Sequence, residues 1–170
     1  MRLTSSSLKL IVMSMKTIHL KYCLFFLLLF SCDSDSIVSN TPFTPINIDF
    51  NIIGSGKISL TGTSMDVLPG NYVLTNQNDW TVLLSKINAA NPDTTQSFNT
   101  NVNFNDFIVV ALFDQERSGG GNSIFVTSII ENQTQIGITV GLQTGGIINV
   151  MQQAFQLVKI PKTTKAITFQ

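Results

Sequence analysis

Apolar and polar side chains alternate over much of the chain from residue 46 onward, which is the pattern of half-buried strands. The clearest example is a hairpin in which residues 122–131 and 135–143 flank the two-residue turn Asn132-Gln133. On the return strand the apolar residues occupy every other position, so they share one face. Further strands are predicted over residues 47–52, 57–60, 71–75, 154–160 and 165–169.

One segment has the period of a helix instead. Its apolar residues follow the i, i+3, i+4, i+7 spacing that lines one helix face. Thr75 or Asn76 can cap the start, Asp79 lies where the helix dipole favours an anion, and Asn91-Pro92 ends the helix. The apolar positions are Trp80, Leu83, Leu84 and Ile87.

Residues 107–113 form an unbroken apolar run, which is typical of a central strand covered on both faces. Together with the other strands and the helix, this run predicts one domain over residues 46–170. The expected fold class is α+β, with a mostly antiparallel β-sheet and one principal helix packed on a face of it.

The first 31 residues have the features of a secretory signal peptide. Basic residues follow Met15, an apolar run covers Tyr22–Phe30, and Ser31 precedes Cys32. A basic start, an apolar stretch of about 7–15 residues and a small residue before the cleavage point are typical of such peptides, and this stretch is too short to span a bilayer. Met15 is a possible true start, because residues 1–14 add nothing to the pattern.

The end of that segment, Leu29-Phe30-Ser31-Cys32, resembles a bacterial lipobox. Phe30 stands where a small or aliphatic residue is usual. The resemblance implies that the thiol of Cys32 receives a diacylglycerol and that Cys32 becomes the first residue of the mature protein. The alternative is an ordinary signal peptide in which Cys32 has no such role.

Residues 32–45 are predicted to be the lipidated cysteine and a polar tether, because they contain two prolines and no apolar period. Asp33 and Asp35 resemble acidic signals that send some lipoproteins to the cell surface, although an Asp after the lipidated Cys elsewhere retains lipoproteins in the inner membrane. A merely solvated linker is the simpler interpretation. The expected location is the outer membrane of a Gram-negative bacterium, with the domain periplasmic or surface-exposed.

Charge and composition exclude several classes of function. The chain has 170 residues, with ten basic and ten acidic side chains, and four of the basic ones lie before Cys32. The mature chain is therefore acidic and lacks the basic surface that nucleic acids require. It contains no histidine and no cysteine other than Cys32, so Ser-His-Asp or Cys-His catalysis, an ordinary zinc site and an internal disulfide are not expected. We predict no catalytic residue, metal or cofactor.

Four segments carry a resemblance to a known family: Asn78 to Trp80, Asn103 to Ala111, Ser118 to Ile124 and Gln156 to Lys162. They resemble the C-terminal domain of the protease-complex subunit PrcB family, and the similarity runs from about Tyr72 to Gln170. This family commonly has Gly-Gly-Tyr at Gly120-Gly121-Asn122 and Pro-Tyr at Ala154-Phe155, so two aromatic residues differ here. The resemblance implies a secreted lipoprotein that binds and stabilises a partner protease without itself catalysing a reaction.

The glycine-rich segment after residue 118 is the candidate binding loop. Glycines permit close approach of a backbone to a partner, and their amides could also bind an anion beside a basic residue. A flexible turn between two strands explains the same glycines. The loop residues that we expect to contact a partner are Arg117, Gly119, Gly120, Gly121 and Asn122.

Three other motifs have alternative interpretations. Trp80 or Phe155 could form an aromatic platform for a glycan or another small ligand, which is the second candidate function, although Trp80 also fits a helix core. Asp114 and Glu116 could pair as in glycoside hydrolysis, but a solvated rim is the expected environment. Gly54-Ser55-Gly56-Lys57 lacks the remaining residues of a phosphate-binding loop, so we expect a plain turn before a strand.

Overall fold

A computed structural model of the chain describes residues 42–59, 67–146 and 149–170. All of them belong to the unit Pro42–Gln170. The predicted signal peptide, Cys32 and the tether up to residue 41 lie outside the described residues and stay predictions. Within the described ranges, no helix combines the length and the apolar character needed to cross a membrane.

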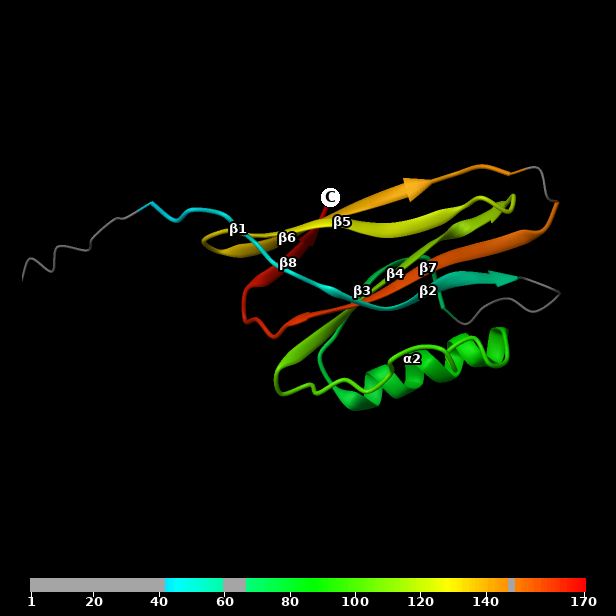
Figure 1. The fold of residues 1–170 in the computed structure, drawn as a ribbon, viewed down its shortest axis with the longest axis horizontal. Coiled ribbons are helices and arrows are strands. Elements are labelled where there is room, and N and C mark those ends of the chain that lie inside the picture. Colours follow the sequence, from blue (N-terminus) through cyan, green and yellow to red (C-terminus); the bar gives the residue numbers. More distant parts are fainter. Residues whose placement is uncertain (1–41, 60–66, 147–148) are drawn as a thin grey trace, which may run out of the picture. The chain divides into compact units, whose positions relative to one another are not determined.

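The described strands form two four-stranded sheets (Figure 1). Every strand pair is antiparallel except the last pair of the first sheet, which is parallel. The first sheet contains, in spatial order, β1 (Ile46–Asn47), β5 (Ser123–Glu131), β6 (Gln135–Gln143) and β8 (Ala166–Phe169). The second contains β2 (Asn51–Ser59), β7 (Met151–Pro161), β4 (Phe107–Ser118) and β3 (Gly70–Leu74). The described helix is α2 (Gln77–Ala90).

The prediction of a mostly antiparallel fold with one helix is confirmed. The expectation of a single sheet is wrong, because residues 48–50 take the chain from β1 in the first sheet to β2 in the second. The segment 47–52, which was expected to be one strand, is divided at this crossing. Ile48 and Phe50 still pack against a hydrophobic cluster that lines both sheets, as the alternation predicts, whereas Ile52, the next apolar residue of the alternation, is exposed.

The hairpin of β5 and β6 is confirmed, with a turn displaced by one residue. Glu131 pairs with Ile136, and the amide of Asn132 donates to the carbonyl of Gln135 at 2.8 Å. The two residues inside the turn are therefore Gln133 and Thr134, and not Asn132-Gln133.

Strand β4 is central in its sheet and is buried on both faces, as the apolar run predicted. Val109, Ala111 and Phe113 belong to a hydrophobic cluster that also contains the buried side chains of α2. The intervening residues of β4 belong to a second cluster, shared with β5 and β6. Because successive strand residues point to opposite faces, one strand contributes to both cores.

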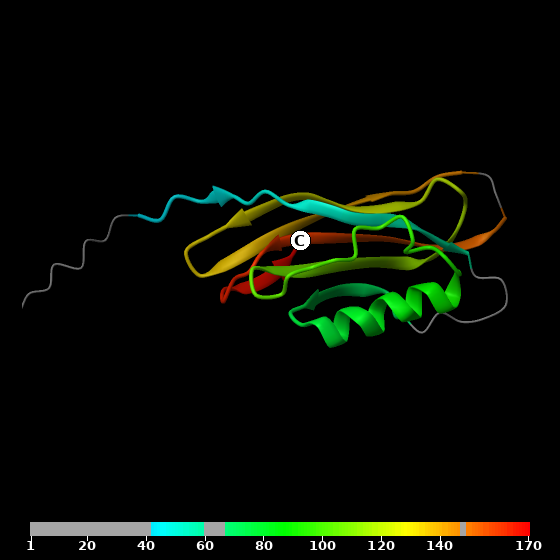
Figure 2. The ribbon, with the colours of Figure 1, turned by 60° about the horizontal axis from the view of Figure 1, so that its bottom comes forward.

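Helix α2 begins and ends where the sequence predicts. The side chain of Asn76 caps it by accepting a hydrogen bond from the amide of Asp79 at 3.0 Å, and Asn91 is the C-cap. Trp80, Leu83 and Ile87 are buried in the cluster that contains β4 and β7 residues. Figure 2 shows α2 alongside the sheet of β3 and β4.

We expect Asn76→Ala to lower the free energy of unfolding by about 1 kcal/mol, because the amide of Asp79 loses its capping acceptor. Equilibrium urea unfolding of the chain measures this loss. Asn78→Ala is the matched control, since Asn78 is exposed in the first turn of the same helix. Equal losses for the two variants would contradict a specific cap.

Gly54 to Lys57 lie inside β2, so the predicted turn is wrong. The two glycines make room for aromatic rings. A Cβ on Gly54 would lie 2.5 Å from the ring of Phe98, and one on Gly56 would lie 3.2 Å from the ring of Phe155. These rings contact each other edge to face with centroids 6.0 Å apart. The glycines that suggested a turn therefore allow two phenylalanines to pack over the strand.

Candidate functional site

The candidate loop lies where the chain passes from β4 in one sheet to β5 in the other. It contacts a second glycine-rich segment, Gly145-Gly146, which follows β6. The amide of Gly121 donates to the carbonyl of Gly145 at 2.7 Å. The sequence predicted the first segment as a site but did not predict its contact with the second.

Three of these glycines, Gly119, Gly121 and Gly146, are required by this backbone contact. Gly119 has a φ of +114°, and a Cβ there would lie 2.8 Å from the carbonyl oxygen of Gly145. A Cβ on Gly121 would lie 2.8 Å from the same oxygen, and one on Gly146 would lie 2.6 Å from the amide nitrogen of Gly120. The two segments therefore approach each other at a distance that only glycine allows.

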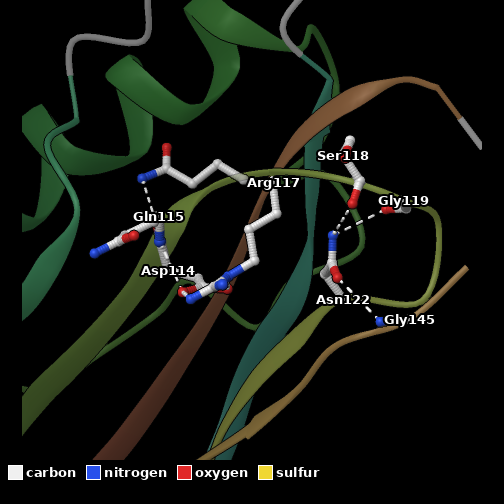
Figure 3. A network of polar contacts seen from close by, with 8 residues as sticks. Asp114, Gln115, Arg117, Ser118, Gly119, Asn122 and Gly145 are labelled. Atoms are coloured by element: carbon white, nitrogen blue, oxygen red, sulfur yellow. Dashed lines mark hydrogen bonds and ion pairs between the residues drawn. The ribbon is translucent and has the colours of Figure 1, made fainter.

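Asn122 joins the two segments through its side chain (Figure 3). It is buried, and its Nδ2 donates to the carbonyls of Ser118 at 3.2 Å and Gly119 at 3.0 Å. Its Oδ1 accepts from the amide of Gly145 at 3.3 Å. One amide side chain therefore binds three backbone groups at and beside the turn.

Lys57 of β2 also binds the loop. Its Nζ donates a hydrogen bond to the carbonyl oxygen of Gly120. This contact connects an edge strand of the second sheet to the turn. The sequence does not reveal it, because the two residues are 63 positions apart.

Arg117 and Asp114 form an ion pair at the end of β4 (Figure 3). Arg117 donates from Nε to Oδ2 of Asp114 at 2.7 Å and from Nη2 to Oδ1 at 3.2 Å. The hydrogen bond and charge of Asp114 raise the pKa of Arg117, so the guanidinium stays protonated. Asp114 also accepts from the amide of Gln115 at 2.7 Å, at an irregularity in the pairing of β4 with β7.

The expectation that Asp114 and Glu116 share a solvated rim is wrong for Asp114. The Asp114 side chain is only 4% exposed, whereas Glu116 is exposed. The irregular pairing between Phe113 and Glu116 separates their environments. A pair of carboxylates facing one substrate is therefore not what these two residues provide.

A polar cavity of about 400 Å³ opens beside the loop. Chemically, it presents backbone groups and hydroxyls as hydrogen-bonding partners, and Asp114 balances the charge of its one cationic residue. No group of three or more His, Cys, Asp or Glu side chains able to hold a metal is found in the described part of the chain. The residues that line the cavity are Arg117, Ser118, Asn122, Thr144, Gly145 and Gly146.

The aromatic platform proposed for a glycan is not available at the predicted residues. Trp80 and Phe155 are both buried in the cluster that joins α2 to its sheet. The Trp80 Nε1 donates to the carbonyl of Thr100 at 2.9 Å, and Phe155 stacks on Phe113 with ring centroids 5.8 Å apart. The alternative that Trp80 is a core residue of the helix is the correct one.

Two buried glutamines of β7 were missed by the sequence analysis. Gln153 donates from Nε2 to the carbonyl of Asp114 at 2.8 Å, and Gln156 accepts at Oε1 from the amide of Val126 at 2.7 Å. Gln156 lies inside the predicted strand 154–160, between Phe155 and Leu157, whereas Gln153 lies one residue before that strand. For Gln156, a glutamine inside an apolar run is the signal that could have identified it, because a buried amide needs a partner.

No family model, curated protein or solved structure matches the chain. The resemblance to the PrcB family therefore remains a prediction from the residues quoted above.

Proposed function

We propose that the protein is a non-enzymatic lipoprotein, held through Cys32 in the outer membrane of a Gram-negative bacterium, with its domain periplasmic or surface-exposed. It acts as an accessory subunit that binds and stabilises a secreted or envelope protein. The resemblance to the PrcB family makes a protease the first candidate partner. The apolar run before Ser31-Cys32 and the polar residues after it support the anchor.

The proposal includes an α+β domain in which α2 packs on one face of the β2-β7-β4-β3 sheet. The hydrophobic cluster shared by Trp80, Ile87 and the strand residues Val109 and Leu157 supports this arrangement. The opposite face of the same sheet contributes to the second cluster, so β4, which leads into the glycine-rich loop, is buried on both faces up to Asp114.

The observation on which partner binding at the loop rests is that its backbone is held in one arrangement. Asn122 binds three backbone groups, Lys57 binds Gly120, and Gly121 binds Gly145. A surface that is ordered before binding loses less conformational entropy when a partner docks. The charged side chain of the loop, Arg117, is paired with Asp114, which favours a role in binding over a role in catalysis.

The absence of enzymatic activity is proposed from the residue types that the mature chain retains. Beyond Cys32 the sequence has neither histidine nor cysteine. Asp114, the buried carboxylate that pairs with Arg117 of the loop cavity, accepts hydrogen bonds from Arg117 and Gln115. Neither feature provides an activated nucleophile of the usual kinds.

Partner capture tests the proposal. The full chain with a C-terminal affinity tag is produced in its own host, crosslinked in intact cells and purified from detergent-solubilised membranes. We expect a defined envelope or secreted protein to co-purify. Ser118→Arg, at an exposed loop position, should lower its recovery about tenfold, equivalent to about 1.4 kcal/mol of binding free energy, because a large cation would meet the contact surface.

Ser97→Arg is the matched control, since Ser97 is also exposed but lies in the segment after α2. It should leave recovery unchanged. If no protein is enriched over an untagged sample, the accessory function loses its support. If both arginine variants lower recovery equally, the loop is not the contact surface.

A further inference from the structure

Four described strands lie at sheet edges, and three of them have features that limit pairing with another chain. Strand β1 has two residues and β8 has four. Strand β2 is longer, but its pairing is irregular between Ile52 and Gly54, and it contains Lys57. Short length, irregular register and charge are the means by which proteins protect sheet edges.

Strand β3 has none of these protections. Its sequence, Gly-Asn-Tyr-Val-Leu, contains no charge and no proline. It pairs with β4 in unbroken register from Gly70 opposite Phe113 to Leu74 opposite Val109. On its other side no described strand pairs with it. A row of backbone donors and acceptors is therefore presented along the outer side of β3.

A mostly apolar cavity of about 320 Å³, whose lining also includes Asp79 and Lys86, lies between β3 and α2, beside this edge. Leu68 is 71% exposed at the cavity and Val82 is 46% exposed. The hydroxyl of Tyr72 donates to the carbonyl of Leu68 at 2.7 Å, which connects the strand to the segment that precedes it. The residues that line the cavity are Val67, Leu68, Tyr72, Leu74, Asp79, Val82, Leu83 and Lys86.

We propose that β3 binds an extended, uncharged segment of a partner protein, which adds to the sheet as a further strand and places an apolar side chain in this cavity. An extended backbone supplies donors and acceptors at the repeat that a strand edge requires, and alternate side chains reach one face. Neither a lipid nor a helix presents backbone donors and acceptors at this spacing. The uncharged strand selects against a charged segment, because pairing would desolvate the charge.

The size of the contact favours a segment over a second copy of the domain. Five residues of strand extend about 17 Å. Such a strand with one cavity provides a small contact, whereas stable interfaces between folded proteins bury about 1,200–2,000 Å². The inference rests on the proposed function, because it names a surface through which a partner is bound. The test of the inference uses no native partner, so the inference and the proposed function can fail separately.

The probe is a blocked seven-residue peptide in which threonine alternates with valine. Hydrogen exchange measured by mass spectrometry follows the full chain, purified in detergent, with and without the peptide. We expect exchange of amides across Gly70–Leu74 to slow about tenfold at saturation, since strand addition protects the edge. The same peptide with alternate nitrogens methylated keeps the side chains, loses the donors, and should give no protection.

Val73→Lys and Ile52→Lys form a matched pair, because both residues are exposed, apolar and β-branched on edge strands of the same sheet. Val73→Lys should weaken peptide binding about tenfold, and Ile52→Lys should not change it. Leu68→Asp should also weaken binding if the cavity receives a side chain. Unchanged exchange of β4 amides in each variant shows that the domain is folded.

Three outcomes would overturn the inference. One is peptide protection at β2 or β8 without protection at β3. Another is no protection at any strand up to the solubility limit of the peptide. The third is protection of β3 that rises with protein concentration in the absence of peptide, which would assign the edge to a second copy. If the peptide binds at β3 but no partner is captured, strand addition at β3 is supported and the accessory function loses its support.

Discussion

Trp80→Ala is expected to lower the free energy of unfolding by about 3–5 kcal/mol, the range for removing a large aromatic side chain from a core. Trp80 is fully buried and lies in the cluster that joins α2 to residues of β4 and β7. The substitution removes this ring and also leaves the carbonyl of Thr100 without the indole donor. Both losses act on the same contact between the helix and its sheet.

Equilibrium urea unfolding measures the effect of Trp80→Ala, with Val82→Ala as the matched control. Val82 lies on the same helix but is 46% exposed, so its truncation should change stability by less than about 0.5 kcal/mol. Trp80→Phe separates the two losses, because it keeps an aromatic ring but cannot donate to Thr100. A loss below about 1 kcal/mol for Trp80→Ala would mean that α2 is not held to the sheet by this face.

The helix and the central strand could be predicted because their signals are local. Asn76, Trp80 and Asn91 specify a cap, a buried face and an end within a short stretch of chain. The apolar run of β4 likewise reports burial on both faces without knowledge of its neighbours. In such segments, the side chains that determine the structure are also the ones that form the pattern.

The division into two sheets could not be predicted in this way, because it depends on partners distant in sequence. Nothing between Asn47 and Asn51 marks the point where the chain leaves β5 and joins β7. By sequence, Gly54 and Gly56 predict a turn, whereas in β2 they accommodate the rings of Phe98 and Phe155. A glycine that permits a turn and a glycine that permits packing look the same in sequence.

The candidate loop was predicted in position but not in structure. The sequence identified the glycines after Ser118 but not Gly145-Gly146, which they contact. The sequence predicts a solvated rim for Asp114, whereas in the structure Asp114 and Arg117 form a partly buried ion pair at an irregular strand end. The edge of β3 had no sequence signal at all, since an unpaired edge is a property of strand order.

Gly119→Ala separates the structural role of the loop glycines from a role in partner binding. We expect it to lower the free energy of unfolding by about 2–4 kcal/mol, combining the penalty of alanine at positive φ with that of an overpacked contact. Gly119 has a φ of +114°, and its Cβ would lie 2.8 Å from a backbone oxygen of Gly145, which cannot rotate away as a flexible side chain could.

Gly145→Ala is the control from the opposite side of the same contact. A Cβ on Gly145 would meet no atom within 4 Å, and its φ lies outside the left-handed region. The free energy of unfolding of the Gly145→Ala variant, measured in urea, should therefore be unchanged or raised by up to about 1 kcal/mol, because alanine restricts the conformations of the unfolded chain. If Gly119→Ala were as neutral as Gly145→Ala, the glycine at 119 would not be required by the fold. Close approach of a bound partner would then become the better explanation for it.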